Sequence, residues 1–75
     1  EVVQSVLSRN IYVHKDSVVK NSILFPRVVI GQGAQVEYAI LDKGVEVADG
    51  VVIRGTAEHP VVVKKGEKVT EDIHS

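Results

Sequence analysis

The stretch "SILFPRVVIGQGAQVEY", residues 22–38, has seventeen residues and lies between two others of the same length, "SVLSRNIYVHKDSVVKN" (residues 5–21) and "AILDKGVEVADGVVIRG" (residues 39–55). When the three are written one under another, their aliphatic residues fall into columns. Within a row these residues follow one another at steps of 6, 6 and 5 residues, which is a hexapeptide rhythm with one shortened step. The columns are Leu7, Leu24, Leu41; Val13, Ile30, Val47; and Val2, Val19, Val36, Ile53.

A second set of columns stands two residues before the first. Because residues i and i−2 point to the same side of a strand, each row predicts three short strands that turn two side chains inward. These earlier positions are Ser5, Ser22, Ala39; Ile11, Val28, Val45; and Ser17, Ala34, Val51.

The strands are separated by predicted corners of three, three and two residues. Seven of the nine corner-ending residues are Gly, Asn or Asp, which tolerate a positive φ; they are Asn10, Arg27, Gly44; Asp16, Gly33, Gly50; and Asn21, Tyr38, Gly55. Arg27 and Tyr38 are the exceptions, and we expect strain or a different corner geometry there.

The repeat predicts an all-β domain, a single-stranded parallel β-helix of hexapeptide repeats with about three full coils of 17 residues and a partial capping coil. Stacking in register is specified because a slip of one residue would turn every aliphatic column outward. An amphipathic helix is not favoured, since β-branched residues dominate and no 3.6-residue period persists. We expect the β-helix to span residues 1–69 and a tail, residues 70–75, to fray.

The two ends of the repeat differ from its middle. Val2 already belongs to a column, so we expect the chain to begin inside an earlier coil and to be a fragment of a longer protein. In the fourth row Glu58 takes the place expected for the successor of Leu41. After Glu58 the row is one residue shorter than the repeat requires, and Val63 and Val69 then keep the six-residue step.

Composition excludes several classes of function. The chain of 75 residues has no cysteine, a net charge of −1, three aromatic residues and no Trp. It therefore has no disulfide framework, no electrostatic basis for binding nucleic acid and no stacking platform for bases. No apolar run approaches the roughly 20 residues of a membrane span.

Two outward-facing groups are candidate interaction sites. Val6, Ile23 and Ile40 are the middle residues of equivalent strands and form a candidate interface, because a contiguous exposed aliphatic stripe marks a contact surface. The basic residues Arg9, Arg27 and Lys43 fall on one corner of successive rows. They form a candidate contact for an anion or a phosphorylated effector, and the alternative is an ordinary solvated edge.

No catalytic, cofactor-binding or metal-binding residue is predicted. His14 would be exposed at a corner, His59 precedes a proline, and His74 lies in the tail. No His, Asp and Glu set has metal-ligand spacing. The "GQG" of residues 31–33 is too short for a phosphate loop.

The segment "NSILFPRVVIGQGAQVEYAILDKGVEVADGVVI" (residues 21–53) resembles the C-terminal left-handed β-helix of bacterial ADP-glucose pyrophosphorylase, also called glucose-1-phosphate adenylyltransferase. The closing "GTAEHPVVVKKGEKV" (residues 55–69) is similar to the glycogen-biosynthesis partner subunit of that enzyme. Parallel crossovers are normally right-handed. The resemblance implies that this coil has the opposite hand and is left-handed. It also implies a cytoplasmic protein of glycogen biosynthesis.

In that family nucleotidyl transfer, with its Mg²⁺, takes place in an N-terminal domain outside this sequence. The resemblance therefore implies an inactive fragment that supports the catalytic domain, joins subunits into a homo- or hetero-oligomer and helps to frame an effector site. Two alternatives stay open. One is the core of a hexapeptide-repeat acyltransferase, which the absence of an insertion in rows two and three disfavours. The other is a purely structural β-helix; an ice-binding surface would need Thr ladders, and only Thr56 and Thr70 are present.

Overall fold

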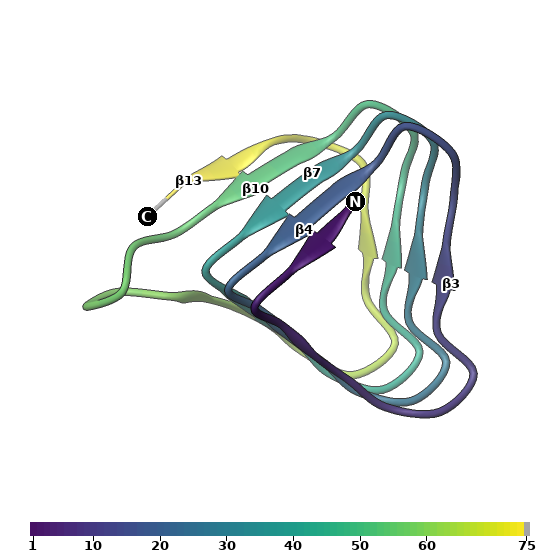
Figure 1. Cartoon of the computed structure of the whole chain (residues 1–75), viewed down its shortest axis with the longest axis horizontal. Coiled ribbons are helices and arrows are strands. Elements are labelled where there is room, and N and C mark those ends of the chain that lie inside the picture. The colour runs from purple at the N-terminus through teal and green to yellow at the C-terminus, as the bar shows by residue number, and fades with distance from the viewer. Residues whose placement is uncertain (75) are drawn as a thin grey trace.

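The computed structural model describes residues 1–74 as a chain wound around a triangular cross-section (Figure 1). Thirteen short strands form three parallel sheets, one along each side of the triangle. The first sheet contains β1 (Val2–Val3), β4 (Val18–Lys20), β7 (Gln35–Glu37), β10 (Val52–Arg54) and β13 (Ile73–His74); the second β2 (Val6–Leu7), β5 (Ile23–Leu24), β8 (Ala39–Leu41) and β11 (Val61–Val63); the third β3 (Tyr12–Val13), β6 (Val29–Ile30), β9 (Glu46–Val47) and β12 (Lys68–Val69).

The register confirms the predicted repeat through the first three turns. Each strand pairs in parallel with the strand one turn later, as Val19 does with Val36, Leu24 with Leu41 and Ile30 with Val47. All these partners are seventeen residues apart. The domain is thus an all-β solenoid of about four turns, and its handedness stays a prediction.

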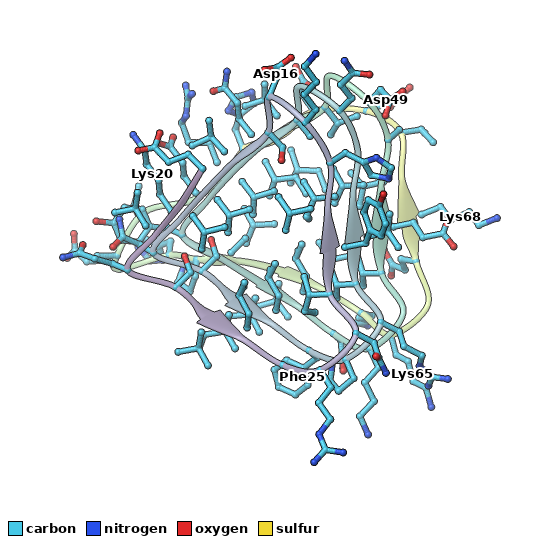
Figure 2. The ribbon with its side chains drawn as sticks, turned by 45° about the vertical axis from the view of Figure 1, so that its right-hand side comes forward. Asp16, Lys20, Phe25, Asp49, Lys65 and Lys68 are labelled. Carbon is cyan, nitrogen blue, oxygen red and sulfur yellow. The ribbon has the colours of Figure 1, made fainter. Side chains whose placement is uncertain are left out.

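The core fills the inside of the triangle with the predicted columns (Figure 2). Each buried Val, Leu or Ile contributes roughly 1.5–3 kcal/mol relative to leaving it exposed, so stacking turns supplies the stability that one turn lacks. The largest fully buried aliphatic residues are Leu24, Ile30, Leu41, Ile53, Val19, Val28, Val36 and Val45.

The two buried inward-facing serines have hydrogen-bond partners for their hydroxyl groups. Ser17 Oγ donates to the carbonyl of His14 at 2.6 Å. Ser22 Oγ donates to the carbonyl of Lys20 at 2.8 Å and accepts from the Ala39 N–H at 3.1 Å. Because buried polar groups are costly only when unpaired, these serines fit an otherwise apolar column.

The corners share one backbone conformation. Eight of the nine predicted corner-ending residues have a positive φ, including Arg27 (66°) and Tyr38 (49°). At Arg27 and Tyr38 we expected either strain or a different corner geometry. The structure shows the same geometry as at the other corners, which is strained for these residues because a side chain at positive φ brings Cβ close to the backbone. Gly55 is the one residue of the set without this conformation. A Cβ there would collide with the carbonyl of Tyr38, so only glycine fits at this position.

The predicted register of the fourth row is wrong. Val63 pairs with Leu41, Val69 with Val47 and Ile73 with Ile53. The chain inserts residues 56–60 as a loop before β11, which shifts Val63 and Val69 along the repeat by the same number of residues. Ile73 comes two residues earlier than this shifted repeat requires, so the turn also lacks two residues before β13. The loop is closed by reciprocal backbone hydrogen bonds of 3.2 Å between Thr56 and His59. A fixed repeat length could not anticipate an insertion and a deletion in one turn.

The fourth turn consequently has all three strands, β11, β12 and β13. Ile73–His74, in the segment predicted to fray, form β13 and pair with β10. Ser75 lies outside the described residues.

Candidate interaction surfaces

The outer face of the second sheet is a continuous aliphatic column. It contains the predicted Val6, Ile23 and Ile40, and the corrected register adds Val62 from β11. Val6 and Val62 are 62% and 63% exposed and Ile23 is 40% exposed, while Ile40 is half-buried. We call these four residues the aliphatic face.

The other two sheets present mixed outer faces. The third sheet carries Tyr12, Val29, Glu46 and Lys68 in one column. The first sheet carries Val18, Gln35 and Val52. An unbroken aliphatic column therefore distinguishes the second sheet, and it marks this side as the best candidate for contact with another protein surface.

Basic residues gather along the corner between the second and third sheets. The structure brings Arg9, Arg27 and Lys43 to this corner in successive turns, since the Arg27 N–H donates to the carbonyl of Arg9 at 3.3 Å and the Gly66 N–H donates to the carbonyl of Lys43 at 2.9 Å. The hydrogen bond from Gly66 to Lys43 also places Lys64 and Lys65, which directly precede Gly66 in the fourth turn, at this corner. We call these five residues the basic edge; all five are exposed.

Sequence reasoning missed Lys64 and Lys65 because it misplaced the fourth turn. The signal was present, since Lys64-Lys65-Gly66 repeats the pattern of Asp42-Lys43-Gly44. Stacked strands are about 4.8 Å apart, so the basic edge presents cations at nearly that interval. Asp42 is the one acidic residue in this corner among the described turns, and its carboxylate accepts from the Lys43 N–H at 2.7 Å.

The remaining two corners carry charges of both signs (Figure 2). In one, Arg54 Nε donates to Glu37 Oε2 at 2.8 Å, and Arg54 Nη2 donates to Gln35 Oε1 at 3.3 Å. In the other, Asp49 Oδ1 accepts from the Gln32 N–H at 2.8 Å, with Lys15 and Asp16 nearby in the stack. Opposite charges offset one another at these corners, whereas the basic edge keeps a net positive charge.

The histidines lie on three different segments of the coil. His14 is exposed at a corner with its ring centroid 4.3 Å from that of Tyr12. His59 lies in the inserted loop and His74 in β13. Within residues 1–74 no group of three or more His, Asp or Glu side chains is placed to hold a metal ion.

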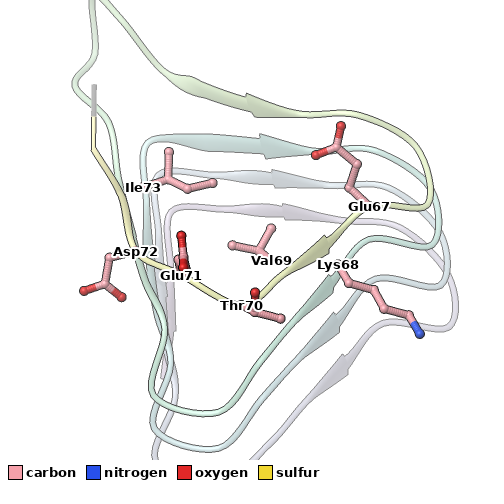
Figure 3. A pocket seen from close by; sticks show the side chains of 7 residues that line it. All are labelled: Glu67, Lys68, Val69, Thr70, Glu71, Asp72 and Ile73. Carbon is pink, nitrogen blue, oxygen red and sulfur yellow. The ribbon is translucent and has the colours of Figure 1, made fainter.

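The C-terminal end of the coil forms an open hollow of about 260 Å³ (Figure 3). It is lined by residues 67–73 of the last turn. Glu67, Val69 and Ile73 point into it, and Lys68 and Asp72 point away. The hollow is therefore the uncovered mouth of the triangle.

The described chain has no helix, and so none that is long and apolar enough to cross a membrane.

Comparison with known proteins gives matches along nearly the whole chain. Residues 1–73 match the family model described as "GlmU-like, C-terminal hexapeptide". The chain is 45% identical over 67 residues to a glucose-1-phosphate adenylyltransferase of Arthrobacter sp. (strain FB24), which covers 89% of this chain and 14% of that protein. It is 40% identical over 72 residues to the glucose-1-phosphate adenylyltransferase of Bifidobacterium adolescentis, covering 96% of this chain and 17% of that protein.

The glucose-1-phosphate adenylyltransferase of Corynebacterium jeikeium is 45% identical over 49 residues, which are 65% of this chain and 12% of that protein. The chain thus spans less than a fifth of the length of these relatives. No solved structure gives a significant match.

Proposed function

Since the chain belongs to the GlmU-like, C-terminal hexapeptide family, we propose that it is the supporting and subunit-joining domain of a glucose-1-phosphate adenylyltransferase-type protein. The aliphatic face is the observation that carries this proposal. A rigid coil that shields its core yet leaves four stacked aliphatic side chains outside is suited to packing against another folded surface.

The chemistry of the whole protein is assigned to a domain outside this sequence. By analogy with the name of its relatives, that domain transfers an adenylyl group to glucose 1-phosphate. We extend the proposal to a cytoplasmic protein of glycogen biosynthesis, as the resemblance of residues 21–53 implies. Mg²⁺ would be bound there, by residues that this chain does not contain. The chain itself is proposed to be inactive and to serve either a catalytic subunit or its partner subunit.

The aliphatic face would pack against that catalytic domain or against another subunit of a homo- or hetero-oligomer. Its residues are β-branched, with the exposed fractions of Val6 and Val62 above one half. Fully covering a side chain of this kind contributes roughly 1.5–3 kcal/mol. Four of them in one column are a sufficient apolar centre for a small interface, with the basic edge along one margin as its polar rim.

The basic edge supports a regulatory part of the proposal. Five cations along one corner attract multiply charged anions, and Arg and Lys are suited to phosphate. We assign this edge to a phosphorylated effector. The Lys64→Ala/Lys65→Ala variant of the full-length protein should lose the response to such an effector, and the control Lys15→Ala/Lys20→Ala should keep it. Equal responses in both variants would exclude the edge.

The experiment on the aliphatic face compares two double variants. Ile23→Thr/Ile40→Thr keeps a β-branched shape and removes apolar surface, and Val29→Thr/Val52→Thr makes the same change on the other two faces. In sedimentation of the full-length protein that contains this chain, the first variant should weaken subunit association about tenfold or more. The second should leave it unchanged. Unchanged association of a folded first variant would refute the proposed contact.

A hexapeptide-repeat acyltransferase is the second candidate. The loop of residues 56–60, which carries His59, is the observation in its favour, because such enzymes use a histidine as a general base. Turnover separates the two candidates. We expect this chain alone to form no ADP-glucose from ATP and glucose 1-phosphate and to transfer no acetyl group from acetyl-CoA. Acetyl transfer that His59→Ala abolishes would establish the second candidate instead.

A further inference from the structure

The third sheet lies between two corners of opposite charge. Each of its strands, β3, β6, β9 and β12, follows the basic edge along the chain and precedes the corner at residues 14–16, 31–33, 48–50 or 70–72. In Figure 2, Lys65 lies at the first of these corners and Asp16 and Asp49 lie at the second, with Lys68 projecting from the sheet between them. The sign of the charge therefore changes across the width of this one face.

The second corner is acidic when all four turns are counted together. Lys15 offsets one carboxylate in the first turn, but residues 48–50 and 70–72 add three carboxylates and no cation, so the offset at this corner is confined to its first turn. The basic edge is the reverse case, since Asp42 offsets one of its five cations. We call the four carboxylates the acidic edge; all are exposed, and they are Asp16, Asp49, Glu71 and Asp72.

The face between the two edges has charges of both signs and one aromatic residue. Glu46 and Lys68 are register partners in adjacent turns. Among the described residues the one ion pair joins Arg54 and Glu37, so Glu46 and Lys68 are both available to a partner. Tyr12, in the same outward column, is 60% exposed, and a large ring with a polar tip is typical of contact surfaces.

Both edges and the face between them project sideways from the coil. Strand centres and corners point away from the coil axis, so a further turn stacked above or below would leave them exposed. Their exposure is thus a property of the side of the solenoid and holds for a coil of any length. This surface is also separate from the aliphatic face, which belongs to the second sheet.

We propose that the outer face of the third sheet binds a second copy of this chain, with the two coils parallel and related by a two-fold axis that runs along them. A two-fold interface brings the same patch of both copies together, so the patch must be complementary to itself. With the axis along the coils, the basic edge of each copy lies against the acidic edge of the other, and this contact is made twice. Complementary charge of this kind selects the partner and fixes the register.

The charges also exclude an antiparallel arrangement of the two coils. A two-fold axis across the coils would bring the basic edge against the basic edge and the acidic edge against the acidic edge, and such like-charge contacts are strongly unfavourable. In the parallel arrangement, residues of the same turn meet at the edges. Lys43 then faces the partner's Asp49, and Lys65 faces the partner's Glu71.

The residues of the face fit the same arrangement. The two-fold axis brings each Glu46 opposite its own copy. Lys68 lies only about 4.8 Å further along the column, so its long side chain reaches the partner's Glu46. The two crossed pairs offset the like charges that the axis brings together.

The test reverses one charge on each edge of the third turn in this chain. Asp49→Lys and Lys43→Glu each turn both edge contacts of a pair into like-charge contacts. Each variant alone should therefore associate at least about tenfold more weakly than wild type in sedimentation. Mixed in equal amounts, the two variants should form a dimer as tight as that of wild type, because each supplies the charge that the other has lost.

A second pair of variants guards against misfolding of the first. Asp49 Oδ1 accepts from the Gln32 N–H at 2.8 Å, so Asp49→Lys also removes a bond within the coil. Glu71→Lys and Lys65→Glu make the same exchange in the fourth turn and leave that bond intact. Far-UV circular dichroism identifies the variants that fold.

The matched controls lie at the corner opposite the third sheet. Lys20→Glu and Glu58→Lys reverse the same kinds of charge there, and both should associate as wild type does, alone and mixed. Raising the salt to about 1 M, where the screening length is about 3 Å, should weaken the wild-type dimer. Ile23→Thr/Ile40→Thr leaves both edges unchanged and should keep the recovery on mixing, so this inference and the proposed role of the aliphatic face fail separately.

Three results would overturn the proposal. They are a wild-type chain that stays monomeric at every concentration, a trimer in place of a dimer, and folded variants of both pairs that gain nothing on mixing. An equal loss of association in the controls would also overturn it. The inference does not rest on the effector proposed for the basic edge, because the acidic-edge variants leave that edge unchanged.

Discussion

Leu24→Asp tests the assigned inside of the coil. Leu24 is completely buried between Leu7 and Leu41, whose strands pair with its own. Loss of the leucine side chain alone costs about 2–5 kcal/mol. An unpaired carboxylate in its place adds several kcal/mol more. A chain of 75 residues has a total stability of about 4–11 kcal/mol. We therefore expect Leu24→Asp to be unfolded.

The matched control is the neighbouring residue. Ile23 is 40% exposed on the aliphatic face, so Ile23→Asp places the same charge outside the coil. We expect this variant to unfold in urea with a midpoint close to that of wild type, as followed by far-UV circular dichroism. A cooperative transition of Leu24→Asp near the wild-type midpoint would refute the assigned register. Unfolding of both variants would show that the outer face tolerates a charged residue no better than the core does.

Further substitutions test the corners. Arg27→Gly should stabilise the coil by about 1 kcal/mol, because glycine adopts the φ of 66° without strain; Arg9→Gly should not, and a lower thermal midpoint for Arg27→Gly would contradict the corner argument. Gly31→Ala should destabilise by about 1–3 kcal/mol in chemical denaturation, since its Cβ would lie 2.6 Å from the backbone nitrogen of Asp49. Arg54→Gln should change stability by less than about 1 kcal/mol, because its ion pair is exposed; a larger loss would assign that pair a structural role.

The sequence was sufficient to predict the fold wherever the repeat length stayed constant. Alternation along a strand and stacking between turns impose independent periods on the same residues, and Leu24, Ile30 and Val36 satisfy both. The type of residue at a corner is a weaker signal. Arg27 and Tyr38 occupy left-handed positions that their side chains disfavour, because the stacked turns on either side over-determine the backbone there.

The fourth turn could not be predicted for a physical reason. A corner is the one place where the coil accepts extra residues, since a loop there leaves the stacked strands untouched. Residues 56–60 use that freedom, and they shift every later residue against the seventeen-residue frame. Val62, Lys64, Lys65 and Glu67 were missed as surface features for this single reason. Local similarity between "DKGVEV" and "KKGEKV" was the better guide than distance along the chain.

A triangular coil also determines where interaction sites can be placed. Inward positions are constrained by stacking, and the buried ones carry aliphatic side chains or serine. Strand centres point outward and share one plane, which suits them to a broad contact such as the aliphatic face. Corners project furthest and repeat at the strand spacing, so residues of one sign there form a linear array of charge. The basic edge has this form, whereas the Arg54–Glu37 corner offsets its charges internally. A flat apolar side next to a cationic ridge is therefore the arrangement from which we infer one partner surface and one anionic ligand.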